Sequence, residues 1–292
     1  MDILIQKGFP DYELIDSGEG MRLERYGTYT IARPDPQALW DKHADEALWQ
    51  KADAVFDVNQ SGSKWQVKGE IPESWPLHYK DLTFNARLTP FKHTGVFPEQ
   101  ALMWDWASEI IKSNIKGAKV LNLFGYTGIA SVAAAQAGAK VTHVDASKPS
   151  ITWANENMKS SGLPGDAIRW ILDDAIKFTK REINRNSTYD AIIMDPPVYG
   201  HGPNKEPWDF NKHFPILLQQ CSKILSPKPL FFLINAYAIS ASSIMLGNVL
   251  SDLMQQYAGT VSYGELALQE SIGKRLLSTG IYARWERDGS SQ

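Results

Sequence analysis

The loop Asp195-Pro196-Pro197-Val198-Tyr199 carries the residue types best suited to chemistry, and it directly follows the apolar run 189–194. Two consecutive prolines fix the backbone and remove two N–H donors, so the loop offers an acid and exposed carbonyl groups as hydrogen-bond acceptors. Such a loop could hold an exocyclic amine while its nitrogen attacks a methyl group, and Tyr199 could stack on a base. Asp195, Pro196, Pro197 and Tyr199 are therefore the catalytic candidates, the alternative being a rigid turn with a capping acid.

A glycine-bearing turn, Phe124-Gly125-Tyr126-Thr127-Gly128, is the second chemical feature. It lies between an apolar strand at 120–124 and a helix of small residues at 129–137, and the next apolar strand ends on Asp145. This order is typical of a nucleotide-binding βαβ unit, in which the turn lets the backbone approach a ligand and the acid accepts hydrogen bonds from ribose hydroxyls. The unit predicts a nucleotide-type ligand.

A third acid stands at the end of the next predicted strand, 167–172, which continues into Asp173-Asp174. Open parallel sheets bind ligands at the carboxyl ends of their strands, so Asp174 is placed to accept a hydrogen bond from an adenine amino group. The alternative is that both acids only cap the helix that starts at Ala175.

The elements that must position these residues alternate between strand and helix. Strands are predicted at 120–124, 141–144, 167–172, 189–194, 230–235, 260–268 and 280–287. This pattern favours an α/β fold with a Rossmann-like, seven-stranded, mainly parallel sheet, helices on both faces and an antiparallel edge. We expect a domain over residues 89–292.

Residues 1–88 have a different character, with short strands separated by Gly, Ser and Pro. They predict a small β-rich N-terminal domain with one helix, from Pro36 to about Lys51, and a possible role in substrate recognition. The tryptophans of this segment either fill a small core or form a base-stacking surface.

Composition and charge narrow the classes of site, compartment and partner that this protein can have. The 292 residues have a net charge of −3 and a single cysteine, so an internal disulfide and a cysteine-based zinc site are excluded, and a metal site is not expected. No apolar run is long enough to span a membrane and the N-terminus lacks a signal pattern, which favours the cytoplasm. The first 95 residues carry 11 Lys and Arg against 15 Asp and Glu, and the rest 19 against 18, so an RNA partner would need a local basic patch.

Seven motifs, in this order and spacing, resemble the class I S-adenosylmethionine-dependent methyltransferases, and more narrowly the bacterial 23S ribosomal RNA methyltransferase group. They are HTGVFPEQ (93–100), VLNLFGYTG (120–128), VTHVDAS (141–147), ANEN (154–157), ILDDAIKF (171–178), MDPPVYGHGP (194–203) and STGIYARW (278–285). The resemblance covers residues 85–287. Asn122 stands where many methyltransferases have an acid, and Phe124 replaces the first glycine of a GxGxG turn.

The resemblance implies S-adenosylmethionine as the cofactor. The residues expected to bind it are Thr94, Gly95, Phe97, Asn122, Phe124, Gly125, Tyr126, Thr127, Gly128, Asp145 and Asp174. Within this set, Phe124 to Gly128 would wrap the methionine moiety, and the methyl group would be delivered at Asp195 to Tyr199.

The type of methyl transfer depends on Cys221. Methylation at a pyrimidine C5 requires a thiolate that first adds to the ring, and the only thiol lies in an apolar helical segment beyond the Asp195 loop. Direct transfer to a nitrogen needs only alignment, so we expect a nitrogen methyltransferase that acts on a base of ribosomal RNA. The alternatives are a C5-cytosine RNA methyltransferase, a small-molecule or protein methyltransferase, a NAD-type Rossmann dehydrogenase and a cofactor-binding module without activity; the oligomeric state is left open.

Overall fold

The structure, a computed structural model, describes residues 1–59, 62–114, 116–237 and 240–289. It divides into two compact units. The core unit comprises Met1–Leu4, Leu102–Glu265 and Gly280–Gln292, and the β-rich unit comprises Ile5–Ala101 and Leu266–Thr279. Each unit therefore draws on more than one stretch of chain. The boundary after residue 88, as a division between functional domains, stays a prediction.

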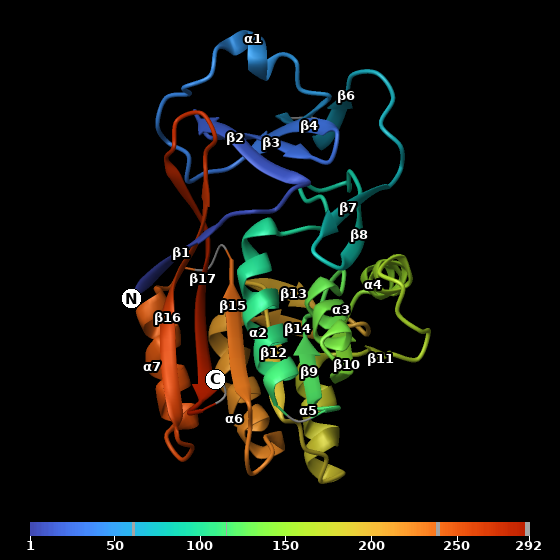
Figure 1. The fold of residues 1–292 in the computed structure, drawn as a ribbon, viewed down its shortest axis with the longest axis vertical. Coiled ribbons are helices and arrows are strands. Elements are labelled where there is room, and N and C mark those ends of the chain that lie inside the picture. The colour runs from blue at the N-terminus through green and yellow to red at the C-terminus, as the bar shows by residue number, and fades with distance from the viewer. Residues whose placement is uncertain (60–61, 115, 238–239, 290–292) are drawn as a thin grey trace. The chain divides into compact units, whose positions relative to one another are not determined.

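One mainly parallel sheet organises the core unit (Figure 1). Its strand order is β1-β16-β17-β15-β12-β9-β10-β11. The strands are β1 (Asp2–Gln6), β9 (Lys119–Leu123), β10 (Lys140–Asp145), β11 (Ile168–Leu172), β12 (Ala191–Met194), β15 (Phe231–Ala236), β16 (Gly259–Gln269) and β17 (Leu276–Arg287). Strands β9 to β12 and β15 run parallel, and β17 pairs with β15 in the antiparallel sense.

The predicted Rossmann-like α/β fold is confirmed, but the count of seven strands is wrong. All seven predicted strands are present, and β1 adds an eighth at the edge next to β16. Its five residues lie at the extreme N-terminus and pair with a strand more than 250 residues away. Such a long-range pairing leaves almost no local sequence signal.

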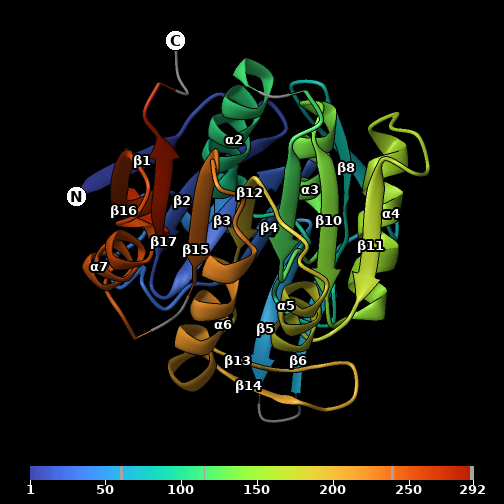
Figure 2. The same ribbon diagram turned by 90° about the horizontal axis from the view of Figure 1, so that it is seen from below.

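Helices cover both faces of this sheet, as a parallel sheet requires. Figure 2 shows α2 and α3 on one side and α5, α6 and α7 on the other, and α4 packs against α3. Their bounds are α2 (Ala101–Ser113), α3 (Ile129–Gln136), α4 (Lys148–Ser160), α5 (Ala175–Asn184), α6 (Phe210–Ile224) and α7 (Ser243–Met254), and a single turn of 3-10 helix, η1 (Pro98–Gln100), precedes α2. Among the described residues, none of the helices has the length and apolarity needed to cross a membrane.

The central strands of the sheet are buried on both faces. Every residue of β12 and β15 is buried, and Ile192 and Phe232 pack with Leu218 of α6 in one apolar cluster. A buried strand of this kind is a rigid support, because its side chains are packed on both sides. The loops that follow these strands therefore start from fixed positions.

The β-rich unit contains a five-stranded and a two-stranded sheet. The strands are β2 (Tyr12–Gly18), β3 (Met21–Tyr26), β4 (Tyr29–Pro34), β5 (Ala54–Asn59), β6 (Gly62–Val67), β7 (Trp75–Tyr79) and β8 (Leu82–Ala86). Trp49 and Trp75 are buried, so these two tryptophans fill core positions.

The predicted helix from Pro36 to Lys51 is wrong: only α1 (Glu46–Trp49) forms. Buried Asp16 explains the difference. Its carboxylate accepts hydrogen bonds from the backbone N–H groups of His43 (3.1 Å) and Ala44 (2.8 Å) and from Trp49 Nε1 (3.1 Å). These groups therefore lie in a loop, because a side chain distant in sequence accepts the hydrogen bonds that helical carbonyl groups would otherwise accept.

Candidate functional site

Strand register brings the predicted site segments together at one edge of the core sheet. Leu123 of β9 lies beside Val144 of β10 and Met194 of β12, and Val144 lies beside Ile171 of β11. Four segments begin at or just after these aligned ends: the turn 124–128, Asp145, Asp173-Asp174 and the Asp195 loop. This is the carboxyl edge at which open α/β sheets bind their ligands.

The turn after β9 has an unusual backbone. Phe124 (φ 56°) and Tyr126 (φ 49°) both have positive φ, as does Gly128 (φ 76°). Non-glycine residues in this region are uncommon and cost free energy, and they cluster at ligand-binding sites. The conformation is held by hydrogen bonds from Gly125 N to Val144 O (3.2 Å) and from Gly128 N to Gly125 O (2.9 Å).

Both glycines of the turn also lie against other elements. A Cβ on Gly125 would stand 2.3 Å from the His143 ring, and a Cβ on Gly128 would stand 2.6 Å from Ala154 Cβ of α4. Gly128 is the N-cap of α3 and supplies no side-chain cap. The first N–H groups of α3 therefore face the turn, where they suit a negatively charged group such as a carboxylate.

Asp145 is held in place by backbone donors. Its Oδ2 accepts from Tyr126 N and its Oδ1 from Ser147 N, both at 2.8 Å. Burial raises the pKa of Asp145, and these backbone N–H groups act in the opposite direction. Because each carboxylate oxygen has two acceptor sites, hydroxyl donors can still bind to the fixed carboxylate.

Asp174 caps helix α5. Its Oδ1 accepts from Lys177 N at 2.9 Å, and neighbouring Asp173 pairs with Arg181. Asp174 is thus the N-cap of α5, as the capping alternative states. The cap uses one oxygen of the carboxylate, and a contact between the second oxygen and adenine stays a prediction.

The Asp195 loop is linked to the turn through Trp208, a residue that the sequence did not single out. Strands β13 (Tyr199–His201) and β14 (Pro207–Asp209) form a small hairpin after the loop. Trp208 Nε1 donates to Pro197 O at 2.6 Å, and the Trp208 ring lies 4.7 Å from the ring of Phe124. One buried side chain therefore supports both chemical segments, while Tyr199 is 72% exposed.

A buried polar chain lies behind the turn. Asn122 Nδ2 donates to Ser131 Oγ (2.8 Å), which lies 3.0 Å from His143 Nδ1. Burial lowers the pKa of His143 to about 3, so its ring is neutral near pH 7. We assign the Ser131 hydroxyl as the donor to Nδ1, which places the ring proton on Nε2. Asn122 is 3% exposed and supports α3, and its predicted contact with the cofactor stays a prediction.

Thr94, Gly95 and Phe97 belong to the β-rich unit, in a loop anchored by Arg33. Arg33 Nη1 donates to Lys92 O at 3.0 Å, and its Nε donates to Glu24 at 2.6 Å. Thr94 and Gly95 are buried, and Gly95 has φ 86°. Their assignment to the cofactor stays a prediction.

Glu24 is the centre of a buried charge cluster. Tyr12 and Tyr26 donate to its carboxylate at 2.9 and 3.1 Å. Burial alone would raise the pKa of Glu24, but Arg22 and Arg33 outweigh burial and lower it to about 2. The carboxylate is thus charged at any physiological pH and fixes the arginine that holds the 92–97 loop.

Glu99 in η1 is a further residue that the sequence did not single out. It is 5% exposed, and burial raises its pKa to about 7 against the opposing charge of Arg22. Strongly perturbed carboxyl groups are enriched at functional sites. The only sequence signal was its position in the motif at 93–100.

One cluster has the composition of a metal site: Asp16, His43 and Glu270 of the β-rich unit offer ligand atoms within 4.8 Å of one another. Arg275 Nη2 lies 2.7 Å from His43 Nε2. A guanidinium only donates, so Nε2 accepts and the ring proton sits on Nδ1, which faces Glu270 Oε2 at 3.7 Å. A protonated nitrogen cannot bind a metal, so the geometry favours an imidazole–carboxylate contact.

Comparisons with known proteins agree with this geometry. Residues 55–249 match the family model described as S-adenosylmethionine-dependent methyltransferase. A solved SAM-dependent methyltransferase from Agrobacterium tumefaciens is 45% identical, with a TM-score of 0.94 over 98% of this chain and 93% of that one. A structure described as a SAM-dependent methyltransferase from Streptococcus mutans is 19% identical, with a TM-score of 0.74 over 96% of this chain and 76% of that one, and shows the same fold.

Two curated relatives carry the name ribosomal RNA large subunit methyltransferase K/L. The protein of Shewanella frigidimarina is 36% identical in an alignment of 242 residues that covers 70% of this chain and 33% of that protein. The protein of Shewanella baltica is 36% identical over 146 residues, which is 49% of this chain and 20% of that protein. The chain thus spans a third or less of the length of these relatives.

Proposed function

Because the chain belongs to the S-adenosylmethionine-dependent methyltransferases, we propose that it transfers the methyl group directly to a nitrogen of a base in ribosomal RNA. Membership of this family removes the dehydrogenase alternative. Ribosomal RNA is proposed because of the names of the curated relatives, which are much longer proteins. A reducing cytoplasm is the proposed location, and residues 1–88 are proposed to recognise the substrate.

The cofactor-binding part of the proposal rests on the carboxyl edge of the sheet. S-adenosylmethionine supplies a methyl group activated by its sulfonium. The turn 124–128 and the first N–H groups of α3 are proposed to hold its methionine moiety, with Asp145 on the ribose hydroxyls and Asp174 near the adenine. Binding of the cofactor by Thr94, Gly95 and Phe97 stays part of the same prediction.

One observation carries the assignment of a base as substrate: the loop after β12 combines an acid, a fixed proline pair and an exposed aromatic ring. Tyr199 is 72% exposed, and the loop that carries it is held through Pro197 by Trp208. An exposed ring on a fixed loop suits stacking on a base, which stabilises binding by about 1–3 kcal/mol. Asp195 would accept a hydrogen bond from the amine and so orient the attacking nitrogen.

The burial of Cys221 supports direct transfer. This single cysteine belongs to α6, is 0% exposed and packs within the apolar core cluster, and burial raises the pKa of its thiol. A thiol in this environment is neither ionised nor accessible to a base. The C5-cytosine alternative would require this thiol as nucleophile.

The test compares nucleosides of ribosomal RNA by mass spectrometry in cells with and without the protein. We expect one methylated base to disappear and to return when purified protein and S-adenosylmethionine are added. Asp195→Asn and Tyr199→Ala should lower the transfer rate, Tyr199→Phe should largely retain it, and Cys221→Ala should leave it unchanged. If ribosomal RNA from cells without the protein has lost no methyl group, the proposed substrate is wrong. A Cys221→Ala variant that binds cofactor but transfers no methyl group would refute direct transfer.

A further inference from the structure

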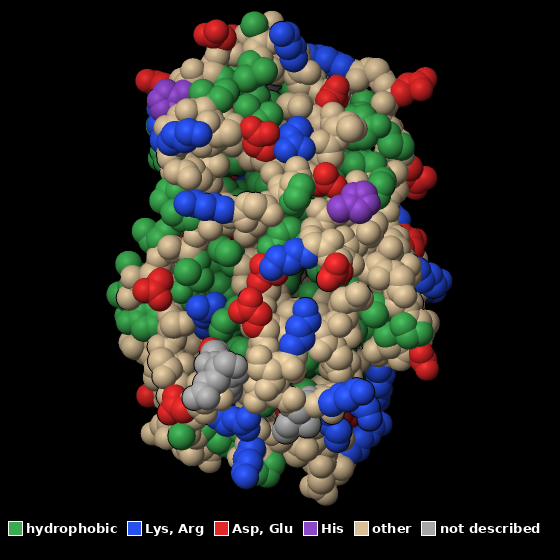
Figure 3. All heavy atoms as spheres, viewed as in Figure 1, with side chains coloured by type: hydrophobic (Ala, Val, Ile, Leu, Met, Phe, Trp, Pro, Cys, Tyr) green, Lys and Arg blue, Asp and Glu red, His purple; other side chains and the backbone are tan. Residues whose placement is uncertain are grey.

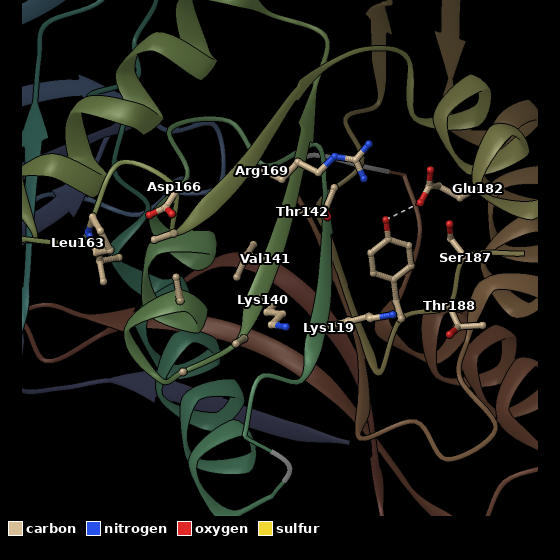
Figure 4. Close-up of a pocket in the computed structure, with 16 residues that line it drawn as sticks. Lys119, Lys140, Val141, Thr142, Leu163, Asp166, Arg169, Glu182, Ser187 and Thr188 are labelled. Carbon is tan, nitrogen blue, oxygen red and sulfur yellow. Dashed lines mark hydrogen bonds between the residues drawn. The ribbon is translucent and has the colours of Figure 1, made fainter. Parts of the chain in front are cut away.

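A cavity lies on the opposite edge of the core sheet, toward the amino ends of its strands. It has a volume of about 730 Å³ and is lined by residues of β9, β10 and β11 and by the segment 187–189 (Figure 4). The polar side chains that matter here are those of Lys119, Lys140, Thr142, Arg169, Ser187 and Thr188. We call this cavity the amino-end pocket. The segments proposed to bind S-adenosylmethionine follow the other ends of the same strands.

The cations of the amino-end pocket come from three neighbouring strands. Lys119 and Lys140 are register partners at the amino ends of the parallel strands β9 and β10, and Arg169 follows on β11. Across the described residues, no ion pair involves Lys119, Lys140 or Arg169, and all three are exposed. Their side chains are therefore available to a negatively charged group in the pocket.

The acids that line the pocket offset its cations only in part, and the charge of Arg169 helps to lower the pKa of Glu182. Glu182 is buried and accepts hydrogen bonds from Tyr189 Oη (2.8 Å) and Arg185 Nη1 (2.9 Å), as the dashed line in Figure 4 shows for the tyrosine. The other acid, Asp166, is exposed. Figure 3 shows Lys and Arg side chains gathered in the region where the amino ends of β9 and β10 and helix α5 lie. A local basic patch of this kind is what an RNA partner requires in a chain of net charge −3.

We propose that the amino-end pocket binds a phosphate group, with Lys119, Lys140 and Arg169 as the cationic partners and the hydroxyls of Ser187 and Thr188 as further donors. The phosphate comes from the backbone of an RNA substrate or from a free phosphate compound. The RNA case rests on the proposed function. Strands β9 and β11, of five residues each, separate the two edges by about 16 Å, so the backbone of a folded RNA at the reacting edge can also reach this pocket.

The test uses the full chain with Lys119→Ala and Lys140→Ala combined. The matched control combines Lys112→Ala and Lys159→Ala, which remove the same charge from exposed lysines of the core unit that do not line the pocket. Binding of a labelled ribosomal RNA fragment is measured by anisotropy between 50 and 200 mM salt, where the slope against salt counts phosphate contacts. Binding of inorganic pyrophosphate is measured by calorimetry.

If the ligand is the RNA backbone, the pocket variant should lose about tenfold in affinity for RNA and its salt slope should fall by about 2, while the control is unchanged. If the ligand is a free phosphate compound, the pocket variant should lose pyrophosphate binding and retain RNA binding. Unchanged binding of both probes by the pocket variant, or no binding of either by the wild type, overturns the proposal. Cofactor binding and methyl transfer are measured in parallel, so a wild type that methylates no RNA would refute the proposed function while pyrophosphate still decides the pocket.

Discussion

Replacing Gly125 by alanine tests whether the turn depends on the polar chain behind it. The added Cβ would stand 2.3 Å from Cε1 and 2.4 Å from Nδ1 of His143, closer than side-chain atoms approach. His143 has little room to retreat, because it is fully buried, hydrogen-bonded to Ser131 and 4.8 Å from the ring of Trp170. Overpacking costs about 1–3 kcal/mol and the lost hydrogen bond about 1 kcal/mol, so the free energy of unfolding should fall by about 2–4 kcal/mol.

A double-mutant cycle isolates this contact. Urea denaturation gives the free energy of unfolding of Gly125→Ala, of His143→Ala and of the double variant, and calorimetry gives the affinity for S-adenosylmethionine. The space left by His143→Ala should accept the new methyl group, so the two costs should differ from additivity by at least about 1 kcal/mol. Gly165→Ala, which meets no atom within 4 Å, is the control. A cost of Gly125→Ala that is equally large without the His143 ring would refute the reasoning.

Three further perturbations test separate parts of the molecule. Glu24→Gln removes the carboxylate that pairs with buried Arg33 and Arg22; Arg22 keeps Asp35 (3.6 Å), but Arg33 loses its counter-charge, so the free energy of unfolding should fall by about 3–5 kcal/mol in urea at pH 7. Glu13→Gln, in a partly exposed pair, should cost at most about 1 kcal/mol; equal losses would contradict this. His143 has a folded pKa of about 3, below the unfolded value of about 6.5, so the unfolded state binds the extra proton between these values. Stability should therefore fall by up to about 1.4 kcal/mol per unit as pH drops from 6.5 to 3, and this contribution should vanish in His143→Ala. Trp208→Phe removes the donor to Pro197 O and should lower kcat/KM for methyl transfer about tenfold while cofactor affinity stays within twofold; an unchanged rate would show that this bond does not position the loop.

The order of strands and helices in the core unit was predictable because its signals are local. Apolar runs mark β9 to β12 and β15, and the glycines of the turn mark positions where side chains would collide. Parallel pairing then places the residues after each strand at one edge, so Asp145 and Asp195 could be located together without any contact being known.

The β-rich unit was harder to predict because distant contacts override its local pattern. Residues 36–51 have a helical arrangement of apolar residues, yet Asp16 takes up two of their backbone N–H groups. Strand β1 depends on a partner at the other end of the chain. In both cases the decisive partner is too far away in sequence for spacing to reveal it.

The same distinction separates two kinds of candidate site residue. Asp145 ends β10, and Asp174 and Asp195 follow β11 and β12, so all three were identified by position. Trp208 and Ser131 come from other elements and contact the predicted site through their side chains. Asn122 belongs with Trp208 and Ser131, although its place in β9 suggested a residue identified by position. Its side chain donates to Ser131 of α3, and Ser131 in turn contacts His143. The candidate groups at this edge therefore come from strand ends, and buried polar and aromatic side chains behind them hold these groups in position.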